Sequence, residues 1–327
     1  MQKSAKIWMD GRLVDWDDAK VHVLTHTLHY GFGVFEGIRC YQTSAGRSAI
    51  FRLPEHNRRL FDSAKILGLK IPFSAEEIEN ACIETVRVNK LRECYIRPIV
   101  FVGDGEMGVP SALSNPVRVS IITWPWGAYL GDEGLKNGIR VVTSSFARFH
   151  VNTLMTKAKA IGHYVNSVLA ACEARVAGFD EALMLDTDGF VSEASGENVF
   201  LVRRGAVKTT PLTSILEGIT RDSVIALLAE SGIRVVEDRF TRDELYIADE
   251  AFLTGTAAEV TPMRELDRRP VGTGKPGEVT KLVQQKFFAI LKGEDKRHEE
   301  WLRICKRLPA TGTNPRRLCP KPEARSP

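Results

Sequence analysis

The chain has 327 residues, of which 43% are hydrophobic and 26% charged, as expected for a globular protein of about two domains. Its formal net charge is +4, but residues 306–327 hold six Lys/Arg and one acid, so the rest of the chain carries −1. A near-neutral body lacks the basic surface of a nucleic-acid-binding protein. The longest apolar run, about six residues, is far shorter than the ~20 that a membrane-spanning helix needs.

Cysteine usage and the N-terminus indicate the compartment. Six cysteines lie far apart without a CxxC pair, and no apolar leader precedes the first strand pattern. We therefore predict a cytoplasmic protein with reduced thiols, no disulfide frame and no zinc site, which binds neither nucleic acid nor membrane.

The first half of the chain alternates between strand patterns and two helices. Asp10-Gly11 between two apolar stretches predicts a hairpin, because both turn positions favour positive φ. Pro54 opens a helix that ends near Gly68, and Ser74-x-x-Glu77 is a capping box that opens a second. Further strands are expected at 33–41, 48–53, 94–102 and 117–124.

Residues 125–138 contain four glycines and a proline and are the best candidate for a linker. Beyond them we expect strands at 139–144, 233–237 and 250–254, a hairpin-rich stretch at 181–208, and helices at 160–176, 219–230, 241–247 and 277–292. The mixture in both halves indicates two α+β domains with mixed sheets. The predicted division is a small domain at 1–124, the linker at 125–138, a large domain at 139–305 and a disordered, proline-rich tail at 306–327.

Two motifs match patterns for a dinucleotide site and a metal site, but we expect neither site. Gly103-x-Gly105-x-x-Gly108 follows a strand, but a dinucleotide fingerprint also needs a helix that starts inside the motif, and Pro110 comes too soon for one. His26-x-x-His29 has no neighbouring cluster of metal-ligating residues, so two ordinary polar histidines are the better interpretation.

Four other segments place polar groups where pattern alone predicts core. Their glycines would allow close approach of the backbone to a ligand, and a buried arginine is costly unless it meets an anion. Taken one at a time, each of these segments is better explained by a structural glycine or by solvent-exposed lysines and acids than by a functional site. The four segments are 29–39, 95–98, 155–164 and 192–198.

Together these segments resemble the class IV aminotransferases, which use pyridoxal 5′-phosphate, and most closely the branched-chain amino acid aminotransferases. The resemblance runs in order from about residue 5 to 292 and implies the two-domain architecture of fold type IV, like that of D-amino acid aminotransferase. The matching stretches are 30–31, 34–41, 95–98, 107–108, 125–131, 158–160, 164–167, 192–193, 196–198, 218–221 and 255–259.

The resemblance implies that Lys159 attaches covalently to the cofactor aldehyde; Lys157, two residues away, is the rival. It implies that Glu193 pairs with the pyridine nitrogen and that Tyr164 lies near the phenolate oxygen of the cofactor. The implied phosphate contacts are Arg59, with Arg58 as the competitor, and Ile219, Thr220 and Thr256. A helix that begins after Gly218 would offer free N–H groups to an anion.

For the substrate, the resemblance implies an apolar pocket built by Tyr30, Phe35, Trp126, Tyr129 and Tyr164, and a backbone donor at Ala257 for the α-carboxylate. Arg97 would meet the distal carboxylate of 2-oxoglutarate, because arginine binds carboxylates bidentately. A structural ion pair is the alternative for Arg97.

The implied activity is reversible transfer of the amino group between L-leucine, L-isoleucine or L-valine and 2-oxoglutarate, with ping-pong kinetics, in a homodimer or homohexamer. The alternative within the family is an enzyme that acts on D-amino acids, on amines or on aminodeoxychorismate. A non-catalytic protein of the same fold is a third interpretation, disfavoured by the presence of both Lys159 and Glu193.

Overall fold

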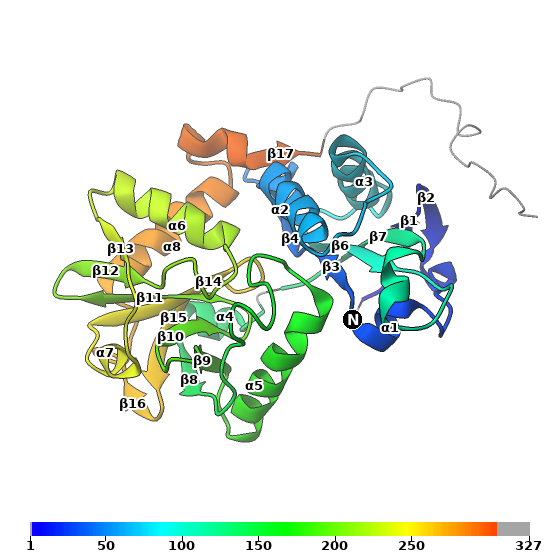
Figure 1. Ribbon diagram of the computed structural model, residues 1–327. Helices are drawn as coiled ribbons and strands as arrows, with labels where there is room; N and C mark the ends of the chain where they lie inside the picture. Colours follow the sequence, from blue (N-terminus) through cyan, green and yellow to red (C-terminus); the bar gives the residue numbers. More distant parts are fainter. Residues whose placement is uncertain (1, 128, 306–327) are drawn as a thin grey trace, which may run out of the picture.

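A computed structural model describes residues 2–127 and 129–305. The predicted tail at 306–327 lies outside the described residues. In the described part, the strands form two sheets, which lie on opposite sides of the molecule in Figure 1.

The first sheet has eight strands in the order β17-β5-β4-β6-β7-β1-β2, with β3 paired to β6. Every pair is antiparallel, so the prediction of mixed sheets does not hold for this one. Its strands are β1 (Lys6–Met9), β2 (Arg12–Asp15), β3 (Gly33–Phe35), β4 (Ile38–Gln42), β5 (Ser48–Phe51), β6 (Cys94–Val102), β7 (Val117–Trp124) and β17 (Leu302–Ile304).

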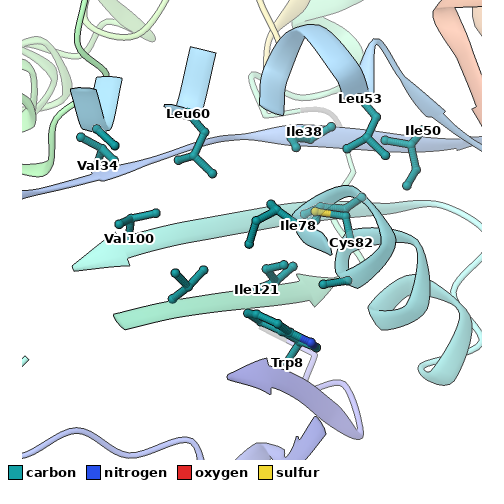
Figure 2. Packing of buried hydrophobic residues seen from close by; sticks show 14 of the residues in the cluster. Trp8, Val34, Ile38, Ile50, Leu53, Leu60, Ile78, Cys82, Val100 and Ile121 are labelled. Atoms are coloured by element: carbon teal, nitrogen blue, oxygen red, sulfur yellow. The ribbon is translucent and has the colours of Figure 1, made fainter. Parts of the chain in front are cut away.

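Helices α2 (Leu53–Ile66) and α3 (Ala75–Val88) cover one face of this sheet. Figure 2 shows Leu60 of α2 and Ile78 of α3 pointing toward strand residues such as Val100 and Ile121, all of them buried. The capping box predicted for α3 is present: Glu77 N–H donates to Ser74 Oγ (3.2 Å) and Ser74 N–H to Glu77 Oε2 (2.7 Å).

The second sheet has nine strands in the order β10-β9-β8-β15-β14-β11-β12-β13, with β16 paired to β15. It is mixed as predicted, because β8 runs parallel to both β9 and β15, and β12 to β13. Its strands are β8 (Ile139–Thr143), β9 (Glu181–Leu185), β10 (Val191–Ala194), β11 (Asn198–Arg203), β12 (Ala206–Thr209), β13 (Val235–Glu237), β14 (Glu250–Gly255), β15 (Glu259–Leu266) and β16 (Arg269–Pro270).

Both faces of the second sheet are buried. Phe200 and Phe252 stack at 5.0 Å and pack with helices α6 (Ile219–Glu230) and α8 (Glu278–Leu291), whereas their neighbours Val199 and Leu253 point into the core on the opposite face. This alternation follows from the two-residue period of a strand. Helix α5 (Tyr164–Val176) packs on β9.

Several details differ from the sequence-based expectations. The strand expected at 33–41 is broken at Glu36-Gly37 into β3 and β4, and the expected linker contains helix α4 (Asp132–Asn137). Two helices of five residues are present, α1 (His26–Tyr30) and α7 (Arg242–Tyr246). Of these, only α7 was predicted. Strand β15 was not predicted. Pro262 lies inside it, and proline is unusual in a strand interior.

The C-terminal part of the described chain returns to the first sheet. After α8, a 3-10 helix (Lys296–Trp301) leads into β17, which pairs antiparallel with β5. The division into two domains stays a prediction, but strands from both ends of the described chain build the first sheet. No helix of the described residues combines the length and apolar character needed to cross a membrane. None of their His, Cys, Asp and Glu side chains form a metal-binding group of three.

Candidate active site

A cavity of about 280 Å³ lies between the two sheets. Of the thirteen residues that the sequence analysis assigned to the site, twelve line it. They come from β3, α2, β6, the 125–131 loop, the segment before α5, β10, the N-terminus of α6 and the turn after β14. The lining set is Phe35, Gly37, Arg59, Tyr95, Arg97, Trp126, Tyr129, Lys159, Tyr164, Glu193, Gly196, Glu197, Asn198, Leu216, Gly218, Ile219, Thr220, Thr254, Gly255, Thr256 and Ala257.

Backbone groups of Lys159 bond to α2 and β3. Its N–H donates to Ser63 Oγ (3.0 Å), and its carbonyl accepts from Phe35 N–H (3.1 Å). Its Nζ lies in the cavity, 2.6 Å from the phenol oxygen of Tyr164, the first residue of α5. An amine held against a phenol in this way can exchange a proton with it.

Lys157 does not share this position. The chain turns at 155–158, where Ala158 N–H donates to Met155 O (3.0 Å), so the segment is not extended and the two lysines do not point the same way. Lys157 Nζ bonds instead to Leu212 O and lies 3.2 Å from Glu217 Oε1. Lys157 does not line the cavity.

The carboxyl group of Glu193 is buried, and both of its oxygens have partners. Its Oε1 lies 2.7 Å from Arg148 Nη2, and its Oε2 accepts from Asn198 Nδ2 (3.2 Å) and Leu216 N–H (3.3 Å). Burial raises the pKa of Glu193, and the charge on Arg148 opposes that rise. A neighbouring acid, Glu197, has a pKa raised well above its usual range by burial and by the nearby charge of Glu181.

The part of the cavity at the N-terminus of α6 is suited to an anion. Helix α6 begins at Ile219, its N-cap is Gly218, and no side chain caps its first N–H groups. Arg59 and the turn residue Thr256 line the same cavity, and the buried hydroxyl of Thr254 has no hydrogen-bond partner among the described residues. A Cβ at Gly218 would overlap Asn198 Oδ1, so only glycine fits there. The set of free N–H groups, hydroxyls and guanidinium suits a phosphate.

Of the two adjacent arginines on α2, only Arg59 reaches this site. Arg58 is exposed. Arg59 Nη1 donates to Glu217 O (2.6 Å), and its Nε and Nη2 bond to Glu36 (2.7 and 3.0 Å).

Aromatic rings form the other wall of the cavity. Trp126 packs edge-on against Tyr95 and Tyr129, with centroids 4.7 and 5.5 Å apart, and Phe35 packs against Tyr164 at 4.8 Å. Burial and the nearby Glu197 and Glu181 raise the pKa of Tyr129 to about 12, so its hydroxyl stays protonated at neutral pH.

Arg97 projects from β6 into this aromatic wall. Its guanidinium lies 4.7 Å from the ring centre of Phe35 and 5.3 Å from that of Tyr95. Its buried Nε has no hydrogen-bond partner in the described part of the chain, nor does a carboxylate there form an ion pair with it. The structural ion pair considered as an alternative is therefore not seen within residues 2–127 and 129–305, and the guanidinium is available to an anion.

Tyr30 is the assigned residue that does not line the cavity. It lies on α1, is 43% exposed, and borders a separate apolar groove with Leu28 and Val165. The reason is the left-handed turn at Gly31, which ends α1 and separates Tyr30 from β3.

Four residues that shape the site were not predicted from the sequence as site residues: Glu36, Arg148, Glu197 and Asn198. Glu197 and Asn198 were in a segment that had been singled out, and their polarity next to Gly196 was a usable signal. Glu36 also lay in a segment that had been singled out, 29–39, but within a stretch predicted to be continuous strand. Arg148 lies in a segment without regular secondary structure, and nothing local marks it.

Comparison with known proteins agrees with this geometry. Residues 33–266 match the family model described as amino-transferase class IV. The chain is 54% identical over 300 residues to the branched-chain-amino-acid aminotransferase of Pseudomonas aeruginosa, covering 92% of this chain and 97% of that one.

Two solved structures are similar over the whole fold. The crystal structure of Escherichia coli branched-chain amino acid aminotransferase has a TM-score of 0.90 at 47% identity and covers 93% of this chain and 100% of that one. The branched-chain amino acid aminotransferase from Thermobaculum terrenum, solved in its PLP-bound holo-form, has a TM-score of 0.87 at 35% identity, with 94% and 100% covered. The chain belongs to the class IV aminotransferases.

Proposed function

We propose that this chain is a branched-chain amino acid aminotransferase that uses pyridoxal 5′-phosphate and transfers the amino group of L-leucine, L-isoleucine or L-valine to 2-oxoglutarate. The observation that carries the proposal is the content of one cavity: a lysine, a buried carboxylate and an anion-binding helix terminus line the same space. The names of the relatives support the choice of substrate class.

The donor set fits the cofactor. Arg59, Thr256 and the N–H groups of Ile219 and Thr220 would hold the phosphate, Glu193 the ring nitrogen, Tyr164 the phenolate oxygen, and Lys159 the aldehyde carbon. When bound, pyridoxal 5′-phosphate supplies an aldehyde that links covalently to amines and a ring that accepts electrons from the bonds at Cα. Glu193 is the right partner for that ring, because a carboxylate stabilises a protonated nitrogen.

Lys159 is the group that moves the substrate proton. A free amine at its Nζ can take the proton from Cα of the amino acid, with the Tyr164 hydroxyl 2.6 Å away as hydrogen-bond partner. The same lysine returns a proton when the 2-oxo acid is the substrate. Two half-reactions at one site give ping-pong kinetics.

The aromatic wall selects the side chain. Phe35, Trp126 and Tyr129 offer apolar surface to a branched aliphatic group, and the N–H of Ala257 lies in the turn beside the phosphate end for the α-carboxylate. Arg97 would receive the distal carboxylate of 2-oxoglutarate or glutamate, since charge-assisted pairs with arginine are strong.

We also propose that the protein is a homo-oligomer in the cytoplasm. Helix α5 exposes Val165, Val168, Leu169 and Val176 at helical spacing, and the apolar groove bordered by Tyr30 adjoins Val165. Contiguous exposed apolar surface of this kind favours association. Size-exclusion chromatography with light scattering would measure the assembly, and a monomer at micromolar concentration would contradict it.

The activity is tested with the purified protein, the cofactor and 2-oxoglutarate. We expect glutamate to form with L-leucine, L-isoleucine and L-valine, and not with D-alanine or with a simple amine. Lys157→Ala, which alters a lysine outside the cavity, is the control for the Lys159→Ala variant. Turnover of D-alanine without turnover of L-leucine would instead favour the alternative within the family.

A further inference from the structure

A buried carboxylate lies behind the proposed phosphate site. Glu36 occupies the break between β3 and β4, and its side chain is completely buried. It points away from the line of the strands toward α2, where it meets His56 and Arg59. Burying a charge in this way is costly unless it is paired and fully hydrogen-bonded.

Four donors satisfy the Glu36 carboxylate. Oε1 accepts from Arg59 Nε (2.7 Å), and Oε2 accepts from Arg59 Nη2 (3.0 Å), His56 Nδ1–H (2.7 Å) and Gly37 N–H (3.2 Å). Burial would raise the pKa of Glu36, but the charge of Arg59 and the hydrogen bonds from Arg59 and His56 hold it well below its usual range. Burial lowers the pKa of His56, so the ring is neutral and acts as a hydrogen-bond donor.

These contacts fix the direction in which Arg59 can bind an anion. A guanidinium has five N–H groups. Glu36 takes two of those on Arg59, and Glu217 O takes a third at 2.6 Å. One N–H remains on each Nη, and Arg59 lines the cavity beside Ile219 and Thr220.

We propose that Glu36, supported by His56, is a positioning residue that orders the Arg59 guanidinium before the phosphate binds. The inference rests on the proposed function, because the anion is the phosphate of the cofactor. An arginine that is ordered in the free protein loses less conformational entropy on binding than one that is not.

Charge alone gives the opposite expectation. Glu36 carries a negative charge next to a site for a phosphate, so simple electrostatics predicts that its removal tightens phosphate binding. Positioning predicts that removal of the Glu36 charge weakens phosphate binding. An amide cannot accept hydrogen bonds on both of its terminal atoms, so Arg59 loses one of its two bonds to residue 36. The sign of the change therefore distinguishes the two explanations.

The experiment titrates cofactor-free protein with two probes, pyridoxal 5′-phosphate and pyridoxal, which lacks the phosphate, and follows cofactor absorbance. In Glu36→Gln we expect the Kd for pyridoxal 5′-phosphate to rise about tenfold, and that for pyridoxal to stay within about twofold. Glu55→Gln is the matched control: Glu55 lies on the same helix and pairs with Arg52 at 2.9 Å, outside the cavity.

A second pair of variants covers the case in which Glu36→Gln does not fold. His56→Ala removes one donor to Glu36 and should weaken pyridoxal 5′-phosphate binding in the same direction, whereas His56→Asn retains an amide donor near the position of Nδ1 and should restore it.

Unchanged or tighter binding of pyridoxal 5′-phosphate in folded Glu36→Gln would overturn the proposal. So would an equal loss for both probes, and, where Glu36→Gln does not fold, unchanged binding in His56→Ala. Failure of the unaltered protein to bind pyridoxal 5′-phosphate would refute the proposed function instead, so the two failures are distinguishable.

Discussion

The Nζ of Lys159 lies 2.6 Å from the phenol oxygen of Tyr164, although the first residue belongs to an irregular segment and the second opens α5. A 3-10 turn at Ile161–His163 connects them and brings Tyr164 back over the lysine. The ring of Phe35 lies 5.1 Å from Nζ and packs against Tyr164, so β3 and α5 both contribute to the position of the amine. This arrangement leads to the first prediction.

Lys159→Ala should abolish transamination, lowering kcat by about a thousandfold or more, because the group that moves the Cα proton is lost. The covalent, borohydride-reducible link to the cofactor should disappear with it. Lys157→Ala should retain both, since Lys157 pairs with Glu217 outside the cavity. Activity with L-leucine and mass spectrometry after borohydride reduction measure the outcome, and substantial turnover by Lys159→Ala would refute the assignment.

Glu193→Gln should bind the cofactor but lower kcat by about 10²–10³-fold, because an amide does not stabilise a protonated ring nitrogen. The amide can retain the bond from Leu216 N–H or Asn198, which preserves the local fold. Cofactor absorbance and single-turnover rates separate binding from chemistry. A kcat near that of the unaltered enzyme would mean that Glu193 only anchors Arg148.

Much of the fold was predictable because its signals are local. Asp10 and Gly11 have positive φ values of 49° and 90°, as the hairpin turn requires, and the Ser74 capping box forms as its spacing indicated. The break at Glu36-Gly37 was not predictable from the strand pattern. At the break Glu36 bonds to His56 and Arg59 of α2, 20 and 23 residues further along the chain, and the strand pattern carries no sign of these partners.

For the site as well, local signals were predictable from the sequence and long-range contacts were not. Sequence spacing left Lys157 and Lys159 both open, and only the resemblance favoured Lys159; the turn at 155–158 that separates them has no glycine or proline to announce it. Arg148 reaches Glu193 across more than forty residues of sequence, so no local pattern could link the two. Long-range ion pairs are a property of the assembled fold.

Gly218→Ala should weaken cofactor binding and destabilise the protein by about 1–3 kcal/mol, because the new methyl group would displace Asn198. Asn198 bridges Glu193 and Leu216 O, so the disturbance would reach the ring-binding carboxylate. Thermal unfolding and cofactor titration measure the two effects. Gly127→Ala, where a Cβ meets no atom within 4 Å, is the matched control for stability, and equal behaviour of the two variants would contradict the prediction.

Arg97→Leu should slow the glutamate and 2-oxoglutarate half-reaction by roughly tenfold to over a hundredfold, since a charge-assisted hydrogen bond contributes about 1.5–3 kcal/mol. The leucine half-reaction should change much less, because leucine has no distal carboxylate. Single-turnover rates followed by cofactor absorbance compare the two. Equal losses would assign Arg97 to the common α-carboxylate or to the aromatic wall formed by Phe35 and Tyr95.

Glu197→Gln should stabilise the cofactor-free protein at neutral pH. Burial and the nearby Glu181 raise the pKa of Glu197, and no ion pair to Glu197 forms in the described part of the chain. A raised pKa means that the folded state binds the proton more tightly than the unfolded state, so the free energy of unfolding falls as pH rises above the unfolded value of about 4.3.

The glutamine variant lacks this titration, so its gain in the free energy of unfolding should be absent below about pH 4 and grow toward pH 7. Urea unfolding of both proteins between pH 4 and pH 8 measures the difference. Glu55→Gln, at a partly exposed and ion-paired site, should show no such gain. A pH-independent difference between Glu197→Gln and the unaltered chain would mean that the carboxyl group of Glu197 is not the titrating group.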